Sequence, residues 1–286
     1  MFTRIATIAR NTFTELVRQK VFYILLVFAL AAIGSSIFMA QLRIEAQFQM
    51  IKDVCLGSMA IFTSLLAILA TASFLPNDSE DRTIYTLLAK PVPRFAYLLG
   101  KLGGIILLLL LFTLMMSVVF CVVLWMREQS ALAQIRQEFA SAPAEQLQLA
   151  IKSVTDATFN INLIPGILLI FVKAALLAAL TLFISTFATS ALFTVMITAA
   201  IYFIGHLQAT AREYWLQGAD IQWWTRILIA LIALLFPDLQ AFNLADDMIA
   251  GAAIPWDIFV KTFALGWLYV AVYASLAAYV FAGREL

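Results

Sequence analysis

Residues 77–101 read NDSEDRTIYTLLAKPVPRFAYLLGK, a polar, charged segment with two prolines that separates two long apolar runs, Val54–Pro76 and Leu102–Met126. Each run is long enough to cross a bilayer as a helix, which needs about 20 mostly apolar residues. This order of apolar run, short polar segment and apolar run is typical of a helical membrane protein. It indicates that residues 77–101 connect two spanning helices on one side of a membrane.

The composition of the whole chain indicates the same class of protein. Of its 286 residues, 64% are hydrophobic and 12% are charged, and the mean hydropathy is +0.97. Soluble domains have about 25% charged and about 45–50% apolar residues. Two cysteines and one histidine are too few for a disulfide framework or a His/Cys metal cluster. A net charge of +1 gives no general attraction for nucleic acid.

Six apolar runs predict six membrane spans and an all-α fold. Besides the two runs already quoted, the spans are Val21–Ala40, Leu163–Ala188, Ala191–Leu207 and Phe259–Ala282. The fourth and fifth runs are joined by almost nothing, which predicts a tight antiparallel hairpin around Thr189–Ser190. The run Ile227–Phe236 is too short to span and ends at Pro237, so it is either re-entrant or interfacial.

Lysine and arginine are concentrated on one side of this six-span topology. With both termini in the cytoplasm, the inner segments hold nine cations in about 50 residues and the outer loops hold seven in about twice that length, as the positive-inside rule requires. A seven-span topology would instead place four acids inside with no cation among them: Asp238, Asp246, Asp247 and Asp257. We therefore expect a multi-pass protein of the cell inner membrane with both termini cytoplasmic.

Residues 1–20 have the pattern of an amphipathic helix. Ile5, Ile8 and Leu16 recur at helical spacing, while Arg4, Glu15 and Arg18 fall on the opposite face. Such a helix lies in the plane of the membrane interface. The alternative is a solvated cationic lead-in that only sets the topology.

Two external regions are predicted between spans. Residues 127–160 are soluble in character, and two amphipathic helices separated by Pro143 are expected there, one around Ile135 and one from Leu147 to Val154. Residues 208–257 form a mixed region of aromatic, acidic and short apolar segments. Neither region is predicted to be a separate domain.

Within the polar segment, the residues from Asn77 to Pro91 predict a short helix. Asn77 or Asp78 can act as the N-cap, and the acids three residues later, Glu80 or Asp81, resemble a capping box. Pro91 ends the helix because it pushes the preceding residue out of helical geometry. A rigid helix at the membrane surface can transmit force from a soluble partner to two spans, or it can be an ordinary capped connector.

The segment EDRTIYTLLAKPVPR, with the following Gly100–Lys101, resembles the signature of type-2 ABC-transporter permeases. The matching positions are Glu80, Thr83, Pro91, Arg94, Gly100 and Lys101. The N-terminal amphipathic helix, the six spans and a re-entrant segment before the last span are also similar to that family. The resemblance implies one transmembrane permease domain over 1–286, with an interface helix (1–20), a coupling segment (77–97), an external loop (127–160) and an external or re-entrant region (208–257).

The resemblance also implies partners. Members of the family pair with a second permease, as a homo- or heterodimer, and with two ATP-binding subunits, and their coupling helix docks in a groove of the ATPase. Carried onto this chain, the ATPase-coupling interface would include Glu80, Asp81, Arg82, Thr83 and Arg94, with Arg4, Glu15 and Arg18 on the N-terminal helix. The family exports lipids, glycans, peptides and drugs, so the resemblance does not identify the substrate.

No nucleotide-binding motif accompanies these features. The pattern GxxxxGK[ST] fails at Gly100–Lys101 because position 95 is Phe and position 102 is Leu. We therefore expect a transporter subunit that is not an enzyme, with no cofactor on this chain and with ATP and Mg bound by the partner. A gradient-driven carrier is the alternative, but it should have intramembrane acids and paired, interrupted halves, and the sequence lacks both.

One ionisable residue falls well inside a predicted span. Lys173 lies about 15 Å along the fourth span from Leu163, at about 1.5 Å per residue, and a charge at that depth marks a functional site by default. Alternatively, Pro165–Gly166 breaks the run and Lys173 snorkels to the outer headgroups. His206, at the end of the fifth span, is interpreted as an interfacial polar residue because no acid neighbours it in sequence.

Overall fold

In the computed structural model, the described residues are 2–36, 44–74, 93–138, 143–159, 163–216, 224, 237–243 and 255–283. Within these ranges every regular element is a helix, as the apolar runs predict. The elements are α1 (Phe2–Val17), α2 (Lys20–Ser35), α3 (Ile44–Ala72), α6 (Arg94–Glu138), α7 (Ala144–Thr158), α8 (Leu163–Ser185), α9 (Ala191–Leu216), the 3-10 turn η2 (Gln240–Phe242) and α12 (Trp256–Gly283).

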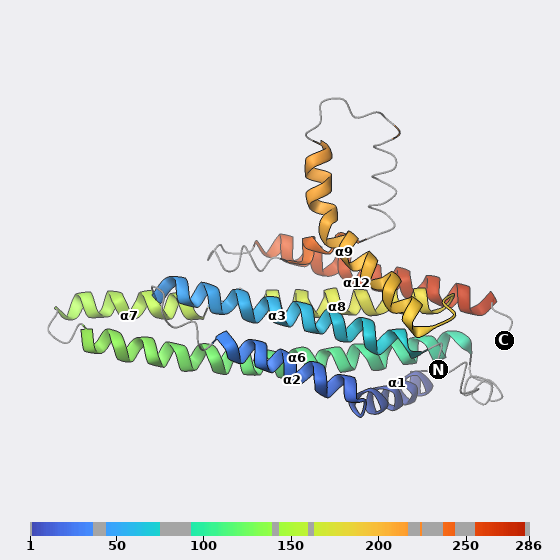
Figure 1. Cartoon of the computed structure of the whole chain (residues 1–286), viewed down its shortest axis with the longest axis horizontal. Helices are drawn as coiled ribbons and strands as arrows, with labels where there is room; N and C mark the ends of the chain where they lie inside the picture. Colours follow the sequence, from blue (N-terminus) through green and yellow to red (C-terminus); the bar gives the residue numbers. More distant parts are fainter. Residues whose placement is uncertain are drawn as a thin grey trace.

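The long helices α3, α6, α8 and α12 run side by side along one axis of the molecule (Figure 1). The start of α1 and the end of α12 lie at the same end of this bundle. A chain that crosses a membrane an even number of times has both of its ends on the same side. The structure therefore agrees with the even-numbered topology.

The number of candidate spans agrees with the predicted six only when one bent pair is included. Five helical stretches in the described part of the chain are long and apolar enough to cross a membrane. A sixth arises if α1 and α2, which meet at a bend of 63°, count as one span. The described part of α2 has only 16 residues, and the rest of the predicted first span, 37–40, lies outside the described residues.

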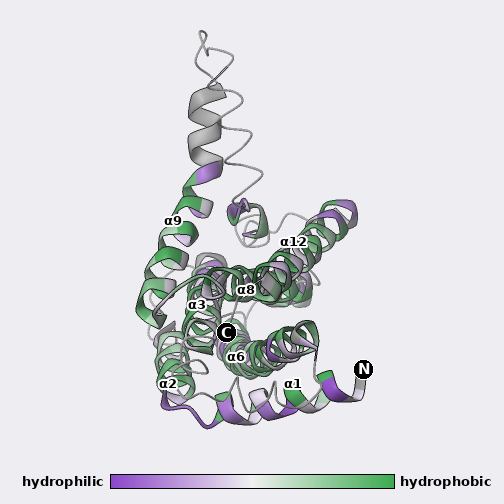
Figure 2. Cartoon of the chain, turned by 90° about the vertical axis from the view of Figure 1, so that its right-hand side faces the viewer, coloured by the Kyte–Doolittle hydropathy of each residue, from purple (hydrophilic) through white to green (hydrophobic). Residues whose placement is uncertain are grey.

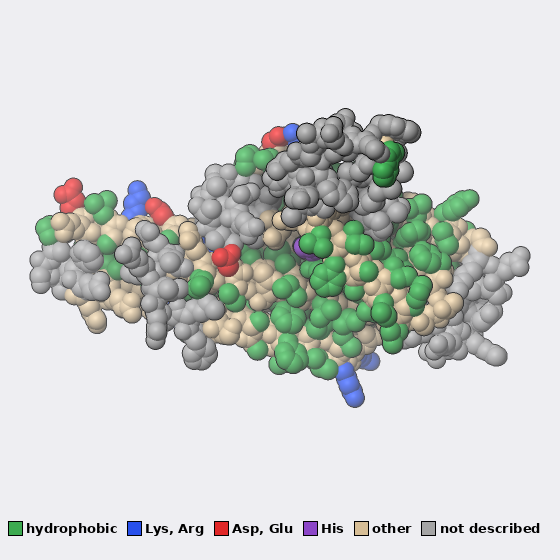
Figure 3. Space-filling view, turned by 45° about the horizontal axis from the view of Figure 1, so that its top comes forward, with side chains coloured by type: hydrophobic (Ala, Val, Ile, Leu, Met, Phe, Trp, Pro, Cys, Tyr) green, Lys and Arg blue, Asp and Glu red, His purple; other side chains and the backbone are tan. Residues whose placement is uncertain are grey.

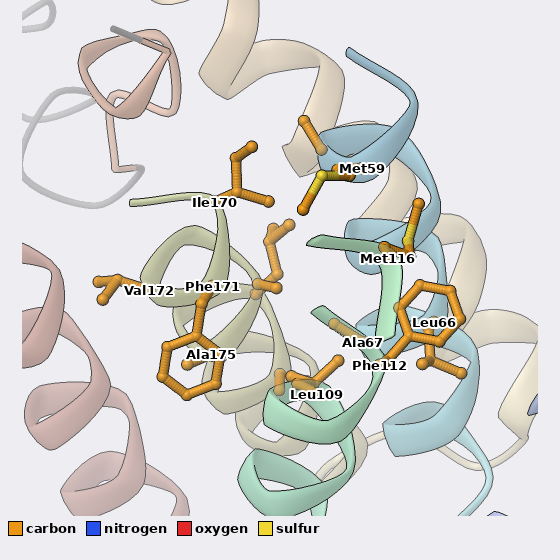
Figure 4. Close-up of a cluster of buried hydrophobic side chains, with 14 of the residues drawn as sticks. Met59, Leu66, Ala67, Leu109, Phe112, Met116, Ile170, Phe171, Val172 and Ala175 are labelled. Atoms are coloured by element: carbon orange, nitrogen blue, oxygen red, sulfur yellow. The ribbon is translucent and has the colours of Figure 1, made fainter. Parts of the chain in front are cut away.

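Helix α8 is the centre of the bundle. It contacts α3, α6, α9 and α12, and nearly all of its side chains are buried. Figure 4 shows its Val172 and Ala175 in a cluster with Met59 of α3 and Phe112 of α6. Because every face of this helix meets a neighbour, its sequence is apolar all round, with none of the polar stripe of a surface helix.

The external loop differs from its prediction. Residues 127–138 do not form a separate helix, because α6 continues through them without a break and is 45 residues long, about 67 Å at about 1.5 Å per residue. Only the second predicted helix, α7, is separate, and Ile135 of α6 is buried beneath it. The Lys52 ammonium of α3 donates a 2.6 Å hydrogen bond to the Ala157 carbonyl of α7.

The outer surface of the bundle is strongly apolar. Large side chains stand exposed on several helices, including Phe28 of α2 (62%), Leu192 of α9 (71%) and Tyr279 of α12 (81%). Figure 3 shows hydrophobic side chains spread over the described face of the bundle. Exposed apolar surface on this scale fits a lipid or protein environment better than water.

Candidate functional site

The N-terminal helix α1 runs across the outer side of the bundle, below α6 and the other helices that are seen end-on in Figure 2. Its buried face, with Ala9, Thr12 and Leu16, packs on the first turns of α6. The opposite face is exposed and carries Arg4 and Arg18. The amphipathic pattern is therefore confirmed, and the apolar face of α1 covers a neighbouring helix.

Two glycines of α6 allow this close approach. A Cβ added at Gly100 would lie 2.7 Å from the Ile8 Cβ, and one added at Gly104 would lie 2.7 Å from the Ala9 carbonyl oxygen. Glycine is unfavourable inside a helix, so close packing of α1 is the physical reason for its use here.

Aromatic contacts bring the end of α3 and the end of α12 to the start of α6, close to α1. The Lys101 ammonium of α6 lies 4.3 Å from the ring centroid of Phe74, just after α3, which is a cation–π distance. Tyr97 of α6 stacks on Phe281 of α12, with centroids 6.3 Å apart. We call the set of α1, the end of α3, the start of α6 and the end of α12 the hub.

The predicted coupling residues fall partly within this hub. Arg94 is the first residue of α6, and Arg4, Glu15 and Arg18 are exposed on α1. The predicted coupling helix with its four site residues, Glu80, Asp81, Arg82 and Thr83, lies outside the described residues. The structure thus describes the attachment points of that segment. Lys101, which sequence reasoning treated only as part of the motif, is also buried in the hub at 8% exposure.

A second polar group lies in the middle of the bundle. Lys173 is 2% exposed, and its ammonium is 2.8 Å from Nε2 of His206 on α9. His206 Nδ1 is 2.9 Å from the Tyr202 carbonyl oxygen, which can only accept a hydrogen bond. The Nδ1 proton is thereby fixed, so neutral His206 accepts at Nε2 and Lys173 donates.

One expectation about these residues is corrected. Helix α8 begins at Leu163 and includes Pro165 in its first turn, where proline is tolerated, so Pro165–Gly166 does not break the helix. The partner of Lys173 is a neutral imidazole on the next helix. The sequence did hold a sign of this contact in the predicted hairpin. Lys173 lies 13 residues before Thr186 and His206 lies 16 residues after Ser190, so the two residues are at similar distances from the hairpin turn.

The segment after the short apolar run packs beside this pair. The Leu239 amide donates a 3.0 Å hydrogen bond to the Gly205 carbonyl on α9, and the Asp238 carboxylate accepts from the backbone amide of Gln240 at 3.1 Å. Phe242 is buried against Gly266 of α12. Residues 237–243 therefore reach the middle of α8, α9 and α12, while the apolar run 227–236 lies outside the described residues.

No group of three or more metal-ligating side chains comes together in the described ranges. The arrangement offers instead an assembled bundle end, where a force could be applied, and the buried Lys173 between α8 and α9.

Comparison with known proteins adds a family. Residues 6–222 match the family model described as ABC-2 family transporter protein. The match includes most of α1, helices α2 to α9 and the segment 77–97, with Lys173 and His206, while Arg4, residues 237–243 and α12 lie outside it. No curated protein matches the chain.

Proposed function

Because the chain belongs to the ABC-2 family of transporter membrane proteins, we propose that it is the permease subunit of an ATP-driven exporter. Hydrolysis of ATP takes place on a separate ATP-binding subunit, which also holds the Mg ion. The chain itself is a transport component of the membrane and carries no nucleotide-binding motif of the P-loop kind.

The observation that carries this proposal is the hub. Residues 75–92 are attached to α3 on one side and to α6 on the other, and Phe74 and Lys101 join those two attachments. Helix α1 packs on the same turns of α6, and α12 meets them through Tyr97. A displacement of residues 77–92 by a docked ATPase is therefore applied to four helices together, because packed helices move as rigid elements.

The docking surface combines the predicted coupling residues with the exposed face of α1. Arg4, Glu15 and Arg18 stand out from that face, and Arg94 begins the helix beneath it. Glu80, Asp81, Arg82 and Thr83 belong to the same surface in the proposal, since their segment starts and ends at the hub. Charges of both signs on a docking surface contribute more to the specificity and orientation of partner binding than to its affinity.

The second permease copy, identical or homologous, covers the outer faces of α9 and α12. These are the least buried candidate spans, with 17% and 28% of their most apolar windows buried, against 83% for the stretch that contains α8. Their exposed side chains are large and apolar, such as Met196 at 66% and Leu268 at 60%. Lipid fills whatever part of these faces the second copy leaves.

Residues 227–237 are re-entrant in this proposal. The segment that follows them contacts Gly205 and Gly266 near the middle of α9 and α12. An interfacial segment would have little reason to lead to that depth. Non-helical backbone inside a membrane is tolerated where protein covers it, and Leu239 is fully buried.

The first test is the composition of the native complex. The tagged chain is purified gently from its own host, and the accompanying chains are identified by mass spectrometry. An ATP-binding subunit is expected, together with a second permease. Transport that persists with no ATP-binding subunit would instead support a gradient-driven carrier.

The second test concerns the coupling surface. Glu80→Lys and Arg82→Glu should abolish the stimulation of ATP hydrolysis by the permease while membrane insertion stays normal. Lys261→Glu is the matched control, because Lys261 is 73% exposed in the first turns of α12, away from the end of α12 that meets the hub. Equal losses at Arg82 and Lys261 would point to general damage and contradict the proposed coupling surface.

A further inference from the structure

Lys173 is held only by neutral groups. Within the described part of the chain no carboxylate pairs with it, and its partners are the His206 imidazole at 2.8 Å and the Tyr202 ring, whose centroid is 5.9 Å away. An ammonium has three hydrogen-bond donors. His206 takes one of them, so two remain without an acceptor among the described residues.

His206 cannot supply a negative charge. The Nδ1–H group donates a hydrogen bond to the Tyr202 carbonyl. The neutral ring therefore presents the lone pair of Nε2 to Lys173. Burial of a charge is strongly unfavourable unless it is paired, and ionisable residues inside membrane proteins usually pair with one another or mark the path of a substrate or ion. The unmet requirement at Lys173 is a negative group with oxygen acceptors.

Helix α9 lies against Lys173 and is itself little buried by the rest of the bundle. Only 17% of the most apolar window of α9 is buried, against 83% for the stretch that contains α8. The side of α9 turned away from the bundle exposes Phe203 at 65% and Leu207 at 64%. Among the described residues, α9 and the segment 237–243 lie beside Lys173, and an outward movement of α9 would uncover it.

The surroundings also limit the rest of the ligand. The neighbours of Lys173 along α8, from Leu169 to Leu177, are apolar and buried, and the outer side of α9 is apolar too. A ligand at this depth needs an apolar body beside its charged group. Phosphate and carboxylate both supply the oxygen acceptors that an ammonium binds through strong charge-assisted hydrogen bonds.

We propose that Lys173 and His206 form an anion-binding subsite between α8 and α9, which takes the phosphate or carboxylate group of a molecule with an apolar chain. The inference rests on the proposed transport function. The ligand is either the transported molecule or a lipid of the bilayer, since both can present this chemistry at this depth. His206 holds the ammonium in place while the subsite is empty and shares it with the anion when the subsite is filled.

The test measures binding of radiolabelled dodecyl phosphate to the full chain in nanodiscs of phosphatidylcholine. Dodecanoate should compete and dodecanol should not. Lys173→Met should weaken binding at least tenfold, as expected for a hydrogen-bonded charge pair, whereas Lys173→Arg should stay within about threefold. Lys261→Met, which removes an exposed charge outside the subsite, should bind as the native chain does.

Several results would overturn the inference. Equal binding by the native chain and Lys173→Met would show that Lys173 does not hold the anion, as would competition by dodecanol as strong as that by dodecanoate. If Lys173→Met does not fold, Lys173→Gln provides the same comparison. Nanodiscs that contain phosphatidylglycerol separate the two sources: suppressed binding of dodecyl phosphate identifies a bilayer lipid, and unchanged binding identifies a transported molecule.

This experiment is independent of the ATPase. Binding is measured on the chain alone, so a missing ATP-binding subunit would not affect it. Conversely, loss of the anion preference would leave coupling at the hub untouched. The two failures are therefore distinguishable.

Discussion

Replacing Gly104 by alanine should loosen α1 from the bundle, whereas the same change one residue earlier should not. The new Cβ at position 104 would lie 2.7 Å from the Ala9 carbonyl oxygen and 2.7 Å from the Thr12 Cβ. At position 103 the nearest atom would be the Ala9 Cβ at 3.5 Å, an ordinary contact. The two positions thus differ in the space available but share one helix and one chemical change.

The magnitude follows from two opposing effects. Alanine is favoured over glycine in a helix by about 0.8–1.0 kcal/mol, and this gain applies at both positions. Overpacking against a backbone carbonyl and a Cβ costs about 1–3 kcal/mol, and this applies only at position 104. Gly103→Ala should therefore raise the free energy of unfolding by up to about 1 kcal/mol, and Gly104→Ala should fall below it by about 1–3 kcal/mol.

The assay is unfolding in mixed micelles of dodecyl maltoside and sodium dodecyl sulfate, followed by the loss of helical circular dichroism. A parallel measurement of hydrogen exchange in residues 2–17 reports on α1 itself, which should exchange faster in Gly104→Ala. If the two variants are equally stable and α1 exchanges equally in both, then α1 is not seated on Gly104 and the hub is wrongly assembled.

Three further predictions concern other contacts. Gly266→Ala should lower stability by about 1–3 kcal/mol, because its Cβ would overlap the Val172 and Phe242 side chains; unchanged thermal unfolding would contradict that packing. Lys52→Met removes the hydrogen bond to Ala157 and should cost about 1.5–3 kcal/mol, seen as faster hydrogen exchange in α7. Lys261→Ala breaks only an exposed ion pair, so a change above about 1 kcal/mol would be unexpected.

The spans could be predicted because lipid leaves the backbone few choices. A run of about 20 apolar residues must satisfy its own hydrogen bonds in the membrane, and a helix does so within the segment. The error in the external loop had a different origin. The apolar run ends at Met126, but residues 127–138 contain no glycine or proline, so nothing in that stretch stops the helix before Glu138.

The contents of the two sites were predictable to different degrees. The polar face of α1 follows from helical spacing alone, and small residues such as Gly104 allow helices to approach closely. The Lys173–His206 contact depends on the register of two helices, which propensity does not set. The sequence interpretation of His206 also required a neighbouring acid, and it therefore did not pair His206 with Lys173. The coupling residues from Glu80 to Thr83 stay a prediction.

The central claim is that an ATPase docks on residues 77–92 and the exposed face of α1. The most direct measurement places a photo-crosslinking amino acid at Arg82 in one variant and at Lys261 in another, in membranes of the native host. The account predicts a crosslinked ATP-binding subunit from position 82 and none from position 261, which lies near the start of α12, away from the end of that helix that meets the hub. Absence of that product from position 82, or an equal yield from both positions, would contradict it.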